Sequence, residues 1–190
     1  RGYNASMENI VIRPNHLLQY TAAGLVLLNI LWAFLRKPFR FFLSANFFAL
    51  YLVVLFSLTI LPIPLSVFQP TPPETIFPPI RINLHPFNVG RAGTLSPQIT
   101  RADYLNVLAF IPFGFLLPFT TKKGKLPILF YALLTTLAIE TIQLLISSRV
   151  PTYSRAFDTT DLITNVLGAW LGYLIARLLI YLFKKSEAQP

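Results

Sequence analysis

The residues best suited to chemistry in this chain are acidic and amide side chains that recur at helical spacing inside apolar segments. Glu140 and Gln143 are three residues apart in "LAIETIQLLI", and Asp161 and Asn165 are four apart in "DTTDLITNVLGAWLG". Either spacing places both members of a pair on one face of a helix. A carboxylate inside such a segment costs roughly 2.5–3.5 kcal/mol on membrane-insertion scales, so Glu140 indicates a functional site.

Glu140 and Asp161 are the candidate catalytic residues, because paired carboxyl groups can act as general acid and base. The same oxygens could instead hold a hard divalent cation, although no cofactor or metal site is otherwise expected. The chain has no cysteine, which excludes disulfides, thiolate metal sites and a cysteine nucleophile. It also lacks the HExxH and GxSxG motifs and has no histidine within an apolar segment. The sequence therefore does not establish a reaction.

Structural explanations exist for the same residues. "TRAD" (100–103) and "DTTD" (158–161) match the capping boxes that satisfy backbone N–H groups at helix starts. Asn165 and Gln143 fit interhelical hydrogen bonds, which contribute about 0.6 kcal/mol each. Glu140 fits an ion pair with Arg149, folding down from the following loop, or with Arg101.

Composition places these residues in a membrane. Hydrophobic residues make up 54% of the chain and charged residues 12%, about half the charged fraction of a soluble domain. Five apolar segments approach the ~20 residues that a helix needs to cross a bilayer; they are 17–35, 42–61, 104–121, 126–148 and 162–183. The predicted fold is all-α: a polytopic membrane protein with five transmembrane helices in one integral membrane domain, residues 1–190.

The segment between the second and third apolar stretches holds more than half of the chain's 16 prolines. Proline fixes φ and removes a backbone donor, so this long proline-rich segment is predicted to be an irregular extracellular loop and not another span.

Basic residues near the helix ends predict the orientation. "RKPFR", "KKGK" and the last "KK" fall on one side of a five-helix arrangement, and every lysine lies there. Under the positive-inside rule this side is cytoplasmic, which puts the N-terminus outside and the C-terminus inside. Because these clusters account for most of the net charge of +9, no nucleic-acid partner is expected.

This topology collects the polar residues at one depth. Glu140 lies about 12 Å below the outer boundary at 1.5 Å per residue, while the inner halves of the last three helices are almost purely apolar. Gly168 and Gly172 form a GxxxG pattern, which lets helices approach closely. We therefore predict an outward-facing polar pocket beside Asp103 and Arg155, with these ligand-binding candidates: Asn106, Glu140, Gln143, Arg149, Asp158, Asp161 and Asn165.

An ordered set of motifs resembles the VanZ-like membrane protein family. The set comprises "NLHPF" (83–87), "NVLAFIPFGFLLP" (106–118), the ExxQ of Glu140 and Gln143, Arg149, and "DTTDLITNVLGAWLG" (158–172). It covers roughly residues 45–180. Residues 7–36 are interpreted as an extra N-terminal helix outside the resemblance, and residues 1–6 as a remnant that is not native.

The resemblance implies a bacterial cell-membrane protein connected with teicoplanin resistance, without implying a reaction. One hypothesis is a binding or resistance factor whose partners, besides membrane lipids, are a lipid-linked cell-wall precursor or a glycopeptide. The proline-rich loop with "NLHPF" would fold over the pocket as a lid. The alternatives are an intramembrane carboxylate enzyme acting on a lipid-linked substrate and a small lipid transporter. The oligomeric state is left open.

Overall fold

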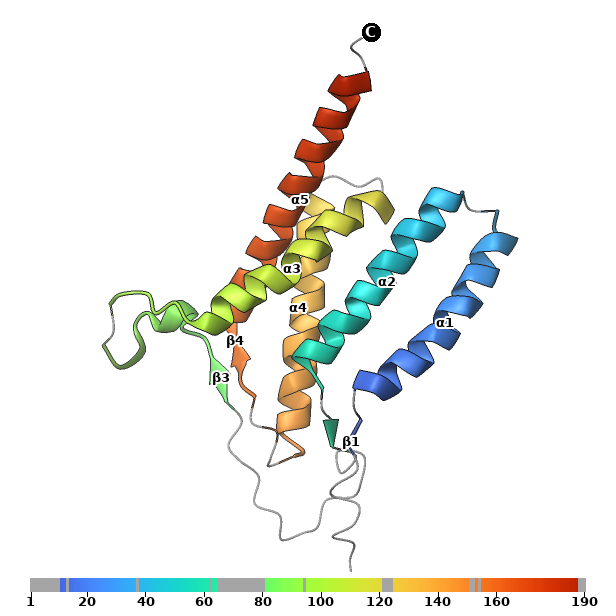
Figure 1. The fold of residues 1–190 in the computed structure, drawn as a ribbon. Helices are drawn as coiled ribbons and strands as arrows, with labels where there is room; N and C mark the ends of the chain where they lie inside the picture. Colours follow the sequence, from blue (N-terminus) through green and yellow to red (C-terminus); the bar gives the residue numbers. More distant parts are fainter. Residues whose placement is uncertain are drawn as a thin grey trace, which may run out of the picture.

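The described residues form five helices of alternating direction in the computed structural model (Figure 1). They are α1 (Pro14–Phe34), α2 (Phe39–Thr59), α3 (Arg101–Thr120), α4 (Lys125–Ser147) and α5 (Thr159–Glu187). The structure describes residues 11–12, 14–36, 38–61, 63–64, 81–93, 95–120, 125–150, 153 and 155–187. Most of the proline-rich segment, 62 and 65–80, lies outside these residues, so its predicted loop character stays a prediction.

Four of these helices are long and apolar enough to cross a membrane: Phe39–Thr59, Arg101–Thr120, Leu126–Ser147 and Thr159–Ser186. The chain is therefore a multi-pass membrane protein. In α1 the apolar stretch that qualifies is the shorter Tyr20–Phe34, so a fifth span stays a prediction. The helix starts follow local chemistry, because α2 begins directly after Pro38 and α3 begins with the predicted capping box. There the Thr100 N–H donates to the Asp103 carboxylate.

The closest helix packing joins α3 to α5, and it depends on small residues. A Cβ added to Gly172 would collide with the Ile111 carbonyl, and one added to Gly114 would collide with the Ala169 carbonyl. Gly168 meets the α3 backbone in the same way, at Val107. The predicted GxxxG crossing is thus observed, with its partner glycine supplied by α3. Backbones in direct contact fix how α3 and α5 lie relative to each other.

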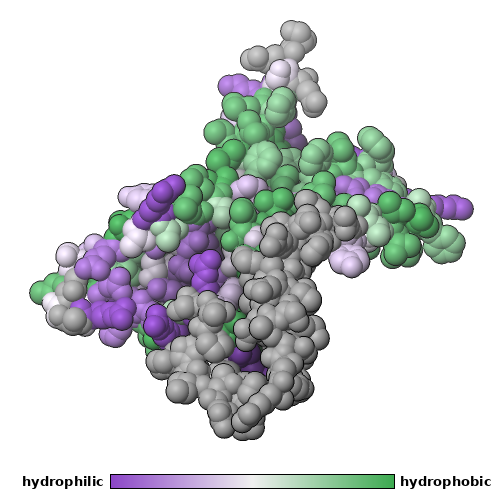
Figure 2. All heavy atoms as spheres, turned by 60° about the horizontal axis from the view of Figure 1, so that its bottom comes forward, coloured by the Kyte–Doolittle hydropathy of each residue, from purple (hydrophilic) through white to green (hydrophobic). Residues whose placement is uncertain are grey.

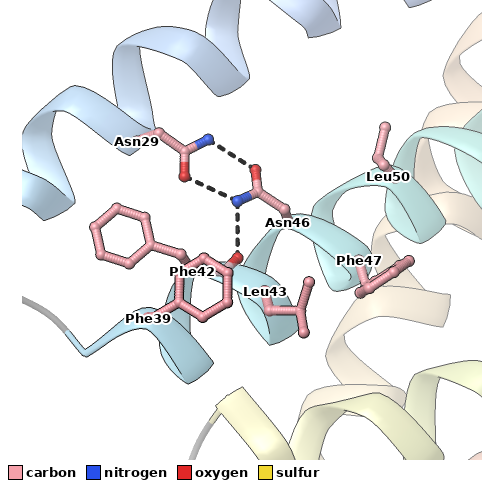
Figure 3. A pocket seen from close by; sticks show the side chains of 7 residues that line it. All are labelled: Asn29, Phe39, Phe42, Leu43, Asn46, Phe47 and Leu50. Atoms are coloured by element: carbon pink, nitrogen blue, oxygen red, sulfur yellow. Dashed lines mark hydrogen bonds between the residues drawn. The ribbon is translucent and has the colours of Figure 1, made fainter.

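Helix α1 lies on the flank and packs mainly against α2 (Figure 1). A reciprocal amide pair joins them inside the apolar layer. The Asn29 Nδ2 donates to the Asn46 Oδ1 at 2.9 Å, and the Asn46 Nδ2 donates back at 2.8 Å (Figure 3). Each amide also donates to a carbonyl of its own helix, at Leu25 and Phe42. These bonds satisfy polar groups that water would otherwise have to solvate.

Two short sheets close one end of the molecule and were not predicted from the sequence. Strands β1 (Val11–Ile12) and β2 (Ile63–Pro64) pair antiparallel, and β3 (Ile82–Asn83) and β4 (Phe157–Asp158) pair parallel. A two-residue strand has no sequence period to detect. The end that carries β3 and β4 is also where hydrophilic side chains gather, on the left of Figure 2.

We expect Gly172→Ala to disrupt the α3–α5 crossing, because the added methyl meets backbone that cannot turn away. Overpacking of this kind typically costs about 1–3 kcal/mol. Gly24→Ala is the matched control, since a Cβ at Gly24 has nothing within 4 Å. Thermal unfolding of the purified variants in detergent should show a lower melting temperature for Gly172→Ala alone. Equal melting temperatures would contradict the close crossing.

Candidate functional site

A polar cavity of about 250 Å³ lies where the start of α3, the C-terminal part of α4 and the start of α5 meet. It opens at the end of the molecule that carries β3 and β4. Its lining is rich in carboxylates and amides, with one arginine; the residues are Phe87, Asn88, Gln98, Thr100, Ala102, Asp103, Gln143, Arg155, Ala156, Asp158, Thr160 and Asp161.

Asp158 caps α5 and holds the preceding loop. Its Oδ1 accepts the Thr160 N–H at 2.8 Å, and its Oδ2 accepts the Asn83 amide at 3.0 Å. A carboxylate at this position also interacts favourably with the positive end of the helix dipole. Both oxygens of Asp158 are therefore used by the fold, which bears out the capping interpretation.

Glu140 supplies the other half of this cap. In a capping box the third helical residue, here Asp161, accepts the N–H of the capping residue. In this fold the Asp158 N–H instead donates to the Glu140 Oε2 at 3.0 Å. Glu140 is 2% exposed, so one buried carboxylate of α4 completes the start of α5.

Asp161 is thereby available for other contacts. Its Oδ1 accepts the Asn106 amide of α3 at 2.8 Å. Its carboxyl group also neighbours the Glu140 carboxyl group, and the two interact electrostatically. Two carboxyl groups can form a hydrogen bond with each other only when one of them carries a proton. The three helices thus meet at a pair of adjacent carboxyl groups.

Glu140 does not form the ion pair considered from the sequence. Its partners among the described residues are the Asp158 N–H and Asp161, and both Arg149 and Arg101 are exposed. The expectation that Arg149 folds down onto Glu140 is wrong, because the backbone donor occupies that place. Arg155, not Arg149, lines the cavity.

The two remaining predicted amides connect the cavity to neighbouring helices. The Gln143 Nε2 donates to the Thr59 carbonyl at the end of α2 at 2.7 Å. Beside it, the Tyr153 hydroxyl donates to the Ile60 carbonyl at 3.0 Å, and burial raises the pKa of this phenol. Deeper, the Asn165 amide donates to the Thr136 hydroxyl at 2.7 Å. Both amides thus serve as interhelical hydrogen-bond donors, and only Gln143 reaches the cavity.

The buried polar side chains of the described residues extend from the cavity end of the bundle as far as Thr136. Beyond it the bundle interior is apolar, with buried Ile128, Ala132, Phe113 and Leu117. In the described part of the chain, the buried polar groups all lie toward the cavity end. This asymmetry agrees with the predicted one.

The "NLHPF" segment forms one wall of the cavity. The Phe87 N–H donates to the Thr160 hydroxyl at 2.9 Å, and the Thr159 hydroxyl donates to the Asn83 carbonyl at 3.2 Å. Phe87 and Asn88 adopt left-handed backbone conformations, with φ of 53° and 57°, which cost about 1–3 kcal/mol each. The wall is therefore held onto the start of α5 by specific bonds that maintain a strained turn.

Comparison with known proteins shows which family this chain belongs to. The family model VanZ/LLP1 matches residues 48–181. The chain belongs to the VanZ/LLP1 family. It is similar to Protein VanZ of Enterococcus faecium, with 35% identity over 134 residues that cover 68% of this chain and 71% of that protein. No solved structure gives a significant match.

The VanZ/LLP1 match contains the whole cavity and does not include α1. The sequence analysis expected "NLHPF", which contains Phe87, to cover the pocket as a lid, whereas Phe87 lines its wall; it did not single out Asn88, Gln98 and Thr160. Thr160 lay inside the recognised "DTTD" motif. The other three lie on a segment whose return to α5 depends on the two-residue pairing of β3 with β4.

The described residues contain no group of three or more His, Cys, Asp or Glu side chains arranged to hold a metal ion. A divalent cation in this VanZ/LLP1 member therefore stays an untested alternative. The arrangement can present carboxylate, amide and guanidinium groups to a ligand, and it brings the carboxyl groups of Glu140 and Asp161 together.

We expect Glu140→Gln to fold normally and Glu140→Leu to be destabilised. Glutamine can still accept the Asp158 N–H and can donate to Asp161, whereas leucine leaves both without a partner. An unsatisfied buried polar group costs about 1–3 kcal/mol. Thermal unfolding of both variants beside the wild type measures this difference. Equal stability of the leucine and glutamine variants would contradict the bridging role of Glu140.

Proposed function

We propose that this protein contributes to glycopeptide resistance of the teicoplanin type by binding an envelope ligand in its polar cavity. The ligand would be a lipid-linked cell-wall component or a lipoglycopeptide. The observation that carries the proposal is a polar cavity open at one end of an otherwise apolar bundle. A site of this kind can hold a polar head group while the lipid part of the ligand stays in the bilayer.

The charges of the cavity favour a ligand that carries both signs. Asp103, Asp158 and Asp161 line it together with Arg155. Carboxylates pair with ammonium groups, and a guanidinium pairs with carboxylate or phosphate in a bidentate way. The peptide of a cell-wall precursor offers ammonium and carboxylate groups, and a lipid carrier offers phosphate. Asn106, Gln143 and Asn165 support the site through their hydrogen bonds, and Arg149 lies exposed at the end of α4.

The cavity faces outside in this proposal. The described lysines Lys184 and Lys185 lie with Arg36 and Arg40 at the opposite end, where α1 turns into α2 and α5 ends, whereas the cavity end carries arginines such as Arg101 and Arg155 but no described lysine. Under the positive-inside rule we take the lysine-bearing end as the cytoplasmic one. With α1 as a fifth span, the N-terminus is outside and the C-terminus is inside.

An enzyme is the second candidate, and the contact between Glu140 and Asp161 favours it. Two carboxyl groups that share one proton can serve as acid and base toward a lipid-linked substrate. A transporter has less support, because the described polar layer ends at Thr136.

Topology is testable because the chain has no native cysteine. Leu95→Cys should react with an impermeant thiol reagent in intact cells, since Leu95 is 89% exposed at the cavity end. Lys185→Cys should react only after the cells are opened. Labelling with the reverse pattern would place the cavity in the cytoplasm and remove the basis for an envelope ligand.

The resistance role is tested by Glu140→Gln and Arg155→Gln, with Arg149→Gln as the matched control outside the cavity. We expect the first two to lose teicoplanin resistance in cells while keeping expression and melting temperature. Glu140→Gln would lose the carboxyl group that can share a proton with Asp161. Arg155→Gln would lose the guanidinium that can pair with an anionic group of the ligand. Growth in teicoplanin and binding of the purified protein to teicoplanin and to a lipid-linked precursor are measured on the same variants. Full resistance in well-folded Glu140→Gln would reduce this glutamate to a structural residue.

Product formation from a lipid-linked precursor separates the two candidates. A binding protein returns the precursor unchanged, whereas an enzyme releases a new species that Glu140→Gln abolishes.

A further inference from the structure

Two apolar grooves flank the first half of α2, one on each side of a ridge formed by Leu43 and Phe47. The groove between α1 and α2 has a volume of about 530 Å³ and contains the Asn29–Asn46 pair (Figure 3). The groove between α2 and α3 has a volume of about 510 Å³. Both volumes fall within the range of about 300–1,000 Å³ that is usual for ligand sites.

The ridge residues belong to both grooves. Leu43 and Phe47 line each of them and are 51% and 55% exposed. They are four residues apart, so they stand one above the other on the helix. Because the same two side chains border both grooves, the grooves open on the same side of α2, toward the lipid.

One charged group is available at this site. Arg40 lines the second groove and is exposed, and its guanidinium has no hydrogen bond or ion pair within the described chain. The hydroxyls in this groove are already used: Ser44 donates to the Phe119 carbonyl at 3.2 Å, and Thr120 donates to the Leu117 carbonyl at 2.9 Å. Arg40 is therefore the group that can recognise a ligand.

The surrounding charge selects the sign of that ligand. Arg36, in the turn before α2, is exposed as well, and Lys184 and Lys185 lie at this end of the bundle. Among the described acidic residues, Glu187 belongs to the end of the bundle that carries Arg40. The others lie at the cavity end: Asp103, Glu140, Asp158 and Asp161. An anionic group is complementary to this end.

We propose that these paired grooves bind one diacyl phospholipid with an anionic head group. Its phosphate pairs with Arg40, and one acyl chain lies on each side of the Leu43–Phe47 ridge. A guanidinium suits phosphate because it offers two parallel donors, and the chains cover apolar surface between neighbouring helices. Such a lipid also holds α1 against the bundle, since one of its chains lies between α1 and α2.

This site is independent of the envelope ligand. Arg40 and the two ridge residues, Leu43 and Phe47, all precede residue 48, where the family match begins. The site is thus built with a part of the chain that lies outside the VanZ/LLP1 match.

The test measures lipid binding to the purified full-length chain in detergent. Phosphatidylglycerol should raise the melting temperature and be retained in native mass spectra, whereas phosphatidylcholine should do so more weakly. Soluble glycerol phosphate should have no effect, because it lacks the chains that the grooves hold. Arg40→Gln should weaken phosphatidylglycerol binding about fivefold, which corresponds to the ~1 kcal/mol that one arginine contributes toward anionic lipid. Arg40→Lys should recover part of it.

Arg177→Gln is the matched control, because Arg177 is also exposed but belongs to α5. It should leave the preference for phosphatidylglycerol unchanged. Equal loss in the Arg40 and Arg177 variants would reduce the effect to general charge attraction and overturn the site. Equal stabilisation of the wild type by both phospholipids would overturn it too, as would a dimer that forms through this face and excludes lipid.

Discussion

The hydrogen bond from the Asp158 N–H to the Glu140 carboxylate is the interaction on which the polar end of this bundle depends. The start of a helix leaves backbone N–H groups without partners, and inside a membrane water cannot satisfy them. Glu140 satisfies one of them from the neighbouring helix. This fixes α4 against the start of α5 and leaves the Asp161 carboxyl group facing Asn106 of α3. Without it, Asp161 would have to complete its own cap.

The bond between Asn106 and Asp161 depends on the close packing of α3 against α5. The glycines of the α3–α5 crossing bring the two backbones into contact, so Asn106 and Asp161 meet at hydrogen-bonding distance. The segment that carries β3 then attaches to the same helix start through Asn83 and Phe87. The cavity is the space left between these bonded elements, and its wall includes a left-handed turn at Phe87 and Asn88. Close backbone packing deeper in the bundle thus supports the polar site at its end.

Much of this arrangement could be predicted from the sequence, because long apolar segments indicate membrane-spanning helices. The five helices, the capping box that starts α3, the close approach at Gly168 and Gly172, and the convergence of Glu140 and Asp161 all follow from spacing. The second predicted capping box is only half formed, because Glu140 and not Asp161 accepts the Asp158 N–H. A charge suggests an ion pair, whereas the actual partner is a backbone N–H that every residue possesses and no sequence pattern marks. The sequence placed "NLHPF" and Arg155 near the pocket, but Asn88 and Gln98 were hidden, since a two-residue strand pairing across about 75 residues has no periodicity.

We propose that Glu140 of α4 and Asp161 of α5 hold one proton between their carboxyl groups, and that Asp161 presents this pair to the ligand cavity. Infrared difference spectroscopy tests this proposal, because a protonated carboxyl group has a carbonyl stretch that is separate from those of carboxylates and amides. We expect one such band in the wild type, absent in Glu140→Gln, and a change in the band when teicoplanin or a lipid-linked precursor is added. A wild type without the band, or a band that persists unchanged in Glu140→Gln, would rule the shared proton out.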